Sequence, residues 1–235
     1  MFSIAIDGPA AAGKTSTAKC VAKKLGFFYI DTGAMYRAVA LYFADNNIDF
    51  TNHEQIKEAL LKINIKHKMR DANAVMFLND EKIENRIRSF EIAEAASKVS
   101  TMYFVRRFLL DFQRNLAKKH NVVMEGRDIT SVVLPDADMK IFLTAKVKER
   151  AKRRSADYKN LGKTNIVFSK VLRDIMIRDI RDTKRRFSPL KQTEDAIIID
   201  NTKYDLEYIA NFIVTLADVN FKGEKDFDSK KKLSL

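Results

Sequence analysis

Short apolar segments recur along the chain, and most are followed by a segment with the periodicity of a helix. The apolar segments lie at residues 1–7, 27–31, 121–126, 140–145 and 196–200. After the first two, residues 14–25 and 34–45 carry apolar side chains every three or four positions, and Gly26 is a typical stop signal. Strands that alternate with helices predict a parallel sheet covered by helices on both faces, the α/β class.

Two segments interrupt this alternation. Between about residues 62 and 90, apolar and polar residues alternate on both sides of the dipeptide Asn79-Asp80, which predicts a hairpin in a small β-rich insertion. Residues 146–165 are rich in charge and predict a helix followed by a mobile loop. The last stretch, 220–235, is charged and aperiodic, which predicts a frayed tail.

Composition narrows the range of functions only partly. The chain has 235 residues, of which 46% are hydrophobic, enough for one sizeable core with an insertion or two. Its formal charge of +12 favours anionic partners, although a solvated basic surface would explain the charge equally well. The single cysteine, Cys20, excludes an intrachain disulfide and fits a reducing compartment. Because no apolar run approaches the ~20 residues of a membrane span and no signal peptide is visible, we expect the cytoplasm.

Residues 8–15, GPAAAGKT, match the pattern G-x-x-x-x-G-K-[ST] between a predicted strand and a predicted helix. In this Gly-rich loop, backbone N–H groups can point inward, and the helix N-terminus adds partial positive charge. Lys14 would contact the β- and γ-phosphates of a nucleoside triphosphate; the alternative is a plain strand–turn–helix connection. The residues predicted to bind the triphosphate are Gly8, Pro9, Ala10, Ala11, Ala12, Gly13, Lys14, Thr15 and Ser16.

A scatter of arginines follows predicted strands or begins predicted helices. These residues are Arg37, Arg106, Arg127, Arg178 and Arg185. The planar guanidinium suits phosphate oxygens, although any one of these residues could be a solvated surface cation. Arg37 and Arg127 follow strands that should end beside the Gly-rich loop, at the edge where open α/β sheets bind ligands. Two phosphate sites on one edge predict phosphoryl transfer between nucleotides.

Four stretches together resemble the successive signatures of the bacterial cytidylate kinases: IAIDGPAAAGKTSTAK, YIDTGAMYRA, EGRDITSVVLPDADMKIFLTA and RDIRDTKRRFSPL. The resemblance runs in order from residue 2 to about residue 216. It implies an enzyme that transfers the γ-phosphoryl group of ATP to CMP or dCMP. It also implies Mg²⁺ carried by the ATP phosphates with no direct protein ligand, except that Thr15 could reach it.

The resemblance implies a P-loop three-layer fold, in which helices flank a central parallel sheet. We expect the core to comprise residues 1–61, 101–145 and 166–218. A β-rich insertion at 62–100 would bind the nucleoside monophosphate, a helical lid would span 146–165, and a flexible tail would occupy 219–235. The expected partners are CMP, dCMP and ATP, without nucleic acid or membrane, and nothing in the sequence requires more than a monomer.

The resemblance also assigns roles residue by residue. It implies that the acceptor phosphate is held by Arg37, Arg127 and Arg178, and that the cytosine edge is read by Ser97, Arg106 and Asp128. It places Asp182, with Arg178, at the ribose, and Thr32 and Tyr36 beside the acceptor. The arginines that resemble those of the lid are Arg150, Arg153 and Arg154, the last two being expected to contact ATP. Arg185 resembles a cation near the transferring phosphoryl group, so the catalytic set is Lys14, Arg127, Arg178 and Arg185.

The chemistry of cytosine agrees with this assignment. Asp128 could accept from the exocyclic amine and Arg106 could donate to the ring acceptors, whereas uracil would place a carbonyl against Asp128. An unpaired buried polar group costs about 1–3 kcal/mol, enough for tens- to hundred-fold discrimination. The alternative for Asp128 is a salt bridge to the adjacent Arg127. Thr130 stands where the family usually has Gly, which could shift Asp128, and Ala11 replaces a frequent Gly with a mild expected effect.

Two other functions are compatible with parts of the sequence. A P-loop kinase for UMP, AMP or shikimate would share the Gly-rich loop but would need a different reader from the set Ser97, Arg106 and Asp128. A basic RNA- or ribosome-associated protein with a regulatory nucleotide site would explain the charge, but no nucleic-acid-binding module is recognisable.

Overall fold

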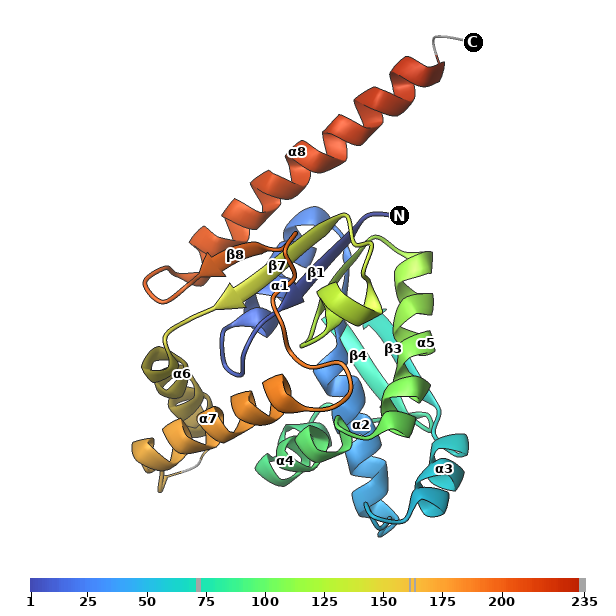
Figure 1. Cartoon of the computed structure of the whole chain (residues 1–235), viewed down its shortest axis with the longest axis vertical. Helices are drawn as coiled ribbons and strands as arrows, with labels where there is room; N and C mark the ends of the chain where they lie inside the picture. The colour runs from blue at the N-terminus through green and yellow to red at the C-terminus, as the bar shows by residue number, and fades with distance from the viewer. Residues whose placement is uncertain (71–72, 161, 163, 233–235) are drawn as a thin grey trace.

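The structure is a computed structural model that describes residues 1–70, 73–160, 162 and 164–232. Within these residues, five strands form a parallel sheet in the order β2-β6-β1-β7-β8 (Figure 1). In the centre, Ile4 of β1 lies opposite Val123 of β6 on one side and Met139 of β7 on the other. The predicted α/β class is therefore confirmed. The strands are β1 (Ser3–Asp7), β2 (Phe28–Asp31), β6 (Val122–Glu125), β7 (Met139–Thr144) and β8 (Ile197–Asp200).

Helices cover both faces of this sheet because its strands are apolar on both sides. Along β1, Ile4 and Ile6 belong to a core shared with α1 and α8, whereas Ala5 belongs to a second core shared with α2 and α5. This alternation follows from the two-residue period of a strand. The helices are α1 (Lys14–Leu25), α2 (Thr32–Asp45), α5 (Tyr103–Lys119) and α8 (Leu206–Lys232).

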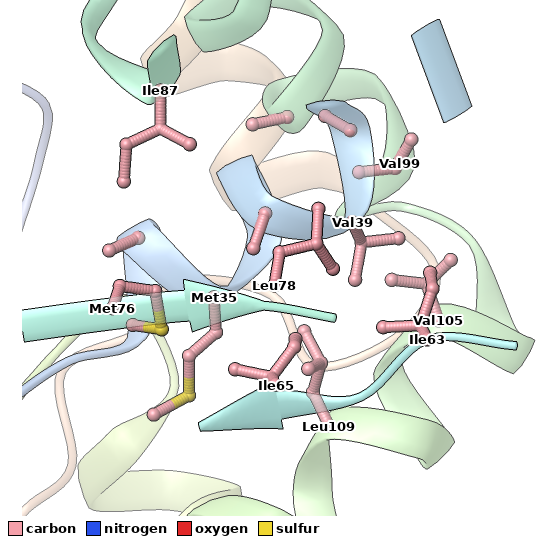
Figure 2. Close-up of a cluster of buried hydrophobic side chains, with 14 of the residues drawn as sticks. Met35, Val39, Ile63, Ile65, Met76, Leu78, Ile87, Val99, Val105 and Leu109 are labelled. Atoms are coloured by element: carbon pink, nitrogen blue, oxygen red, sulfur yellow. The ribbon is translucent and has the colours of Figure 1, made fainter. Parts of the chain in front are cut away.

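The β-rich insertion is a small antiparallel sheet in the order β3-β4-β5. The predicted turn at Asn79-Asp80 joins β4 to β5, and both residues have the positive φ that a two-residue hairpin turn requires. Figure 2 shows Ile65 and Leu78 of the insertion packed in one cluster with Met35 and Leu109, so the insertion shares its core with the main domain. Helix α3 (His53–Leu61) precedes the insertion, whose elements are β3 (Ile65–Arg70), β4 (Asn73–Leu78), β5 (Glu81–Lys82), η1 (Arg86–Arg88) and α4 (Phe90–Val99).

A lid was predicted at residues 146–165, and a core segment was predicted to start at residue 166. Each of these two segments contains one helix. The helix α6 (Val147–Asn160) packs on α7 (Phe168–Lys184) through Ala151, Val171 and Ile175, a small cluster separate from the two main cores. The helical part of the prediction is confirmed. The predicted loop contains residues 161 and 163, which lie outside the described residues.

The C-terminal segment differs from the prediction. Helix α8 continues to Lys232 and projects beyond the sheet in Figure 1, although residues 219–235 were expected to form a flexible, aperiodic tail. Residues 233–235 of that prediction lie outside the described residues. In the part of the chain that the structure describes, no helix is both long and apolar enough to cross a membrane.

Candidate active site

The carboxyl ends of β1, β2 and β6 meet at one edge of the sheet, beside a cavity of about 760 Å³. The Gly-rich loop, the first turn of α2, the turn after β6 and side chains of α4, α6 and α7 line this cavity. This is the edge at which the sequence places the two phosphate sites. Among the predicted site residues, all of which the structure describes, those that do not line the cavity are Gly8, Pro9, Arg106 and Arg150.

The Gly-rich loop is shaped by backbone conformations that side chains disfavour. A Cβ at Gly8 would lie 1.9 Å from the carbonyl oxygen of Leu143, so only glycine lets the chain turn this close to β7. Gly13 has φ of 96° and forms the N-cap of α1. Ala11, the replacement for a frequent Gly, has φ of 58° and thus adopts the left-handed backbone that glycine would supply without strain. The backbone of the loop therefore accommodates this alanine at a left-handed position.

Lys14 lies inside this loop with its ammonium group buried. It is 4% exposed, and its Nζ donates to the carbonyl oxygen of Pro9 at 2.8 Å. Burial, and next the charge of Arg127, lower the pKa of Lys14 to about 7. An anion in the loop would favour the cationic form of Lys14.

Three arginines that line the cavity differ in their hydrogen-bond partners. Arg127 donates from Nε to Asp182 at 2.8 Å, and Arg37 donates to Asp31 at 2.9 Å. Arg178, in contrast, has a buried Nε with no hydrogen-bond partner, and burial together with the charge of Arg127 lowers its pKa to about 10. A buried donor without a partner is costly for the folded protein.

The far end of the cavity is organised around Asp128. Its carboxylate accepts from Arg106 and, at 3.2 Å, from Arg185, and all three side chains are buried. The salt bridge of Asp128 to Arg127 that the sequence left open is therefore wrong, because Arg127 donates to Asp182 instead. Arg106 also lies over the ring of Tyr36, so it supports Asp128 from outside the cavity lining.

Arg185 lies at this end as well. Besides Asp128, it donates from Nε to the carbonyl oxygen of Ser188 at 2.6 Å. These contacts favour a role beside Asp128 over the predicted role near the transferring phosphoryl group. Ser97 of α4 also lines the cavity, and its hydroxyl accepts from Arg181 at 2.8 Å.

The comparisons with known proteins decide the family. Residues 4–219 match the model of the family described as cytidylate kinase. The chain belongs to the cytidylate kinase family. A cytidylate kinase of Thermosipho melanesiensis is 46% identical over 90% of this chain and 94% of its own length. A cytidylate kinase of Acholeplasma laidlawii is 44% identical over 92% of this chain and 94% of its own length. A cytidylate kinase of Lactobacillus gasseri is 39% identical over 96% of this chain and 96% of its own length.

A solved structure supports the fold at lower similarity. An uncharacterised protein from Eubacterium ventriosum covers 93% of this chain, and this chain covers 99% of that protein, with a TM-score of 0.52 and 15% identity. The family identifies the chain as an ATP-dependent kinase that phosphorylates CMP and dCMP. The resemblance that the sequence stretches indicated is thereby confirmed.

In this cytidylate kinase, the three lid arginines differ in their surroundings. Arg150 is buried and donates to the carbonyl oxygens of Ala145 and Ala10 and to Asp179, so it fixes the Gly-rich loop to α6 and α7 rather than facing the cavity. Arg153 lines the cavity and donates to the side chain and carbonyl oxygen of Asn201, both at 2.8 Å. Arg154 also lines it and lies over the ring of Tyr158.

Sequence reasoning missed several residues that shape the site. Asp179 accepts from the backbone N–H of Ala10 at 2.9 Å, and Asn201 donates to the carbonyl oxygen of Ala12 at 2.7 Å, so both hold the Gly-rich loop from distant segments. Asp7 is fully buried and accepts from the backbone N–H groups of Ile129 and Thr130. Only the position of Asp7, at the end of β1 directly before Gly8, could have signalled its role.

Proposed function

We propose that the cavity holds ATP on the Gly-rich loop and CMP or dCMP against Arg37, Arg127 and Arg178, with the base at Asp128. The observation that carries this arrangement is the group of cations that line the cavity, namely buried Lys14 and the half-buried Arg127 and Arg178. The lowered pKa values of Lys14 and Arg178 have burial as their main cause and Arg127 as a further one, and Arg178 keeps an unpaired Nε. Two phosphate groups brought together there would relieve this mutual repulsion.

Transfer in this arrangement needs positioning and charge neutralisation rather than a general base. An anionic oxygen of the acceptor phosphate attacks the γ-phosphorus, and the bond from that phosphorus to the bridging oxygen breaks to release ADP. Lys14 and the arginines hold the repelling phosphates in line. Helices α4, α6 and α7, which line the cavity, would keep water away from the γ-phosphoryl group.

The chain's oxygen donors fit a magnesium ion carried by the nucleotide. Thr15 donates to the carboxylate of Glu125 at 2.6 Å, at the point where β6 ends beside the Gly-rich loop. A hydroxyl and a carboxylate are ligands that Mg²⁺ accepts, directly or through water. When bound, Mg²⁺ would neutralise phosphate charge.

Base selection would rest on the charge of Asp128. Arg106 and Arg185 donate to its carboxylate and hold its oxygens in place, where they could also accept from an amino group. Cytosine carries an exocyclic amine at the position where uracil carries a carbonyl oxygen, so uracil would leave two acceptors facing each other. We propose that Arg106 and Arg185 serve to hold Asp128 in this position.

A panel of acceptors tests the proposal. ADP release should be measured with CMP, dCMP, UMP, AMP and shikimate for the parent and for Asp128→Asn, which keeps the shape and removes the charge. CMP and dCMP should lead in the parent, and the variant should lose at least tenfold in kcat/KM for CMP while ATP still binds. Turnover of UMP equal to that of CMP in the parent would overturn the assignment of the base site.

A further inference from the structure

Arg181 is a cationic residue of the cavity to which neither the motif nor the resemblance gives a role. It lies on α7 between Arg178 and Arg185, and residues three or four apart on a helix share a face. Its side chain lines the cavity, and its relative exposure is 27%. The face that carries the proposed substrate contacts therefore carries one more guanidinium group.

This guanidinium connects α7 to α4 across the cavity. Nη1 of Arg181 donates to Oε1 of Glu94 at 3.0 Å and to the hydroxyl oxygen of Ser97 at 2.8 Å. Glu94 and Ser97 are three residues apart and therefore neighbours on one face of α4. The carboxylate of Glu94 holds the guanidinium in place, and the guanidinium in turn reaches the hydroxyl.

The contact restricts what the hydroxyl of Ser97 can do. A serine hydroxyl has one proton to donate and can accept through two lone pairs. Because a cation occupies one lone pair, the proton points away from Arg181, and no described group accepts it. Ser97 is 3% exposed and lines the cavity, so the proton is available to a ligand there.

We infer that Arg181 is a positioning residue that presents the hydroxyl of Ser97 as a hydrogen-bond donor to an acceptor atom on the base of the monophosphate. The inference rests on the proposed function, because it requires the base to lie beside Ser97 and Asp128. Glu94 contributes to this positioning because its carboxylate accepts a hydrogen bond from the guanidinium of Arg181. Arg181 would act through Ser97 without touching the reacting phosphates.

A double-mutant cycle tests the inference. KM and kcat for CMP are measured at saturating ATP in the parent, Arg181→Met, Ser97→Ala and the combined variant. Each single variant should raise KM for CMP about fivefold to tenfold, the loss of one hydrogen bond, while kcat and KM for ATP stay within about twofold. The combined variant should be no worse than Ser97→Ala alone, because Arg181 would have lost the group through which it acts.

Matched variants separate this role from a structural one. Arg173→Met removes an exposed arginine of the same helix and should leave KM for CMP unchanged, whereas Arg181→Lys, which keeps a cationic donor group, should recover part of the loss. The inference is overturned if Arg181→Met and Ser97→Ala are fully additive. It is also overturned if Arg181→Met lowers the melting temperature and leaves KM unchanged.

The test is distinguishable from that of the proposed function. If Asp128→Asn abolishes the preference for CMP but Ser97→Ala leaves KM for CMP unchanged, the base site stands and the role of Arg181 fails. If Asp128→Asn leaves the preference intact, the proposed base site itself fails.

Discussion

At the scale of single residues, Asp7 and Thr130 hold the turn that carries Asp128. The carboxylate of Asp7 accepts from the backbone N–H of Ile129 at 3.0 Å and from the backbone N–H and hydroxyl of Thr130 at 2.8 and 2.7 Å. Burial raises the pKa of Asp7 to about 6, and these donors oppose that rise. The sequence led us to expect Thr130 mainly to restrict the backbone, but its side chain supplies a donor to a buried carboxylate.

We predict that Thr130→Val lowers the free energy of unfolding by about 1–3 kcal/mol at pH 8, because the ionised carboxylate of Asp7 loses a buried donor. At pH 5 most of Asp7 is protonated in the folded protein, so the loss should be smaller. Urea denaturation at both values measures the difference. Thr130→Ser, which keeps the hydroxyl, serves as the control; equal stability of Thr130→Val and Thr130→Ser at pH 8 would contradict the prediction.

The choice of ionic partners shows how far residue types alone can predict a site. Arg127, which follows a predicted strand, and Asp128, which the resemblance placed at the base, both line the cavity. The sequence could not decide that adjacent side chains point to different partners, Asp182 for Arg127 and two arginines for Asp128. Those partners come from α5 and from the region of α7, and only the folded arrangement brings them together.

At the scale of elements, the insertion is joined to the edge strand β2 by an aromatic contact. Phe28 of β2 lies between His67 of β3, with ring centroids 5.2 Å apart, and His120, at 4.8 Å. The Nδ1 atom of His67 is buried without a hydrogen-bond partner, and burial lowers the pKa of His67 to about 4. The contact therefore requires the neutral imidazole.

This contact should make the folded insertion sensitive to acid. Between pH 4 and 6.5 the unfolded chain binds a proton at His67 that the folded chain does not, so this residue's contribution to stability falls as the pH falls. The variant His67→Phe has no titrating group at this position, so it lacks this pH-dependent contribution to the free energy of unfolding. The stability of the variant relative to the parent should therefore increase by up to about 3 kcal/mol from pH 7 to pH 4. Urea denaturation across this range measures it, and a pH-independent difference would contradict the prediction.

Helix α8 shows why sequence analysis can predict the end of a helix at the wrong residue. Its first turns carry Ile209, Ala210, Ile213 and Ala217, which pack in the core shared with α1. The hydrophobic pattern stops near residue 219, and the prediction ended the helix there. Periodicity reports which residues are buried rather than which are helical, and extending an existing helix is far easier than starting one. The charged residues up to Lys232 therefore continue the helix without the pattern that would reveal it.

At the scale of the whole molecule, the cavity brings together cations from distant parts of the chain. Lys14 begins α1, Arg127 follows β6 and Arg178 lies on α7, and their charges repel one another at the cavity. Two cores on either side of the sheet keep these segments fixed. Binding sites of this kind lower the stability of the empty protein because the charges are arranged for a ligand rather than for one another.

The variant Lys14→Met tests whether the clustered cations lower the stability of the protein without its ligand. Without nucleotide at pH 6.5, the variant should be more stable than the parent by about 1 kcal/mol or more, because it removes a buried ammonium group that Arg127 repels. The pKa of Lys14 lies near 7 in the folded protein and near 10.5 when exposed, so the parent gains stability as the pH rises above 7. The advantage of the variant in stability should therefore shrink by pH 9.

ATP with Mg²⁺ should raise the melting temperature of the parent much more than that of the variant. Thermal melting at both pH values measures each effect, and a variant less stable than the parent at pH 6.5 would show that the ammonium group is stabilised by the protein alone.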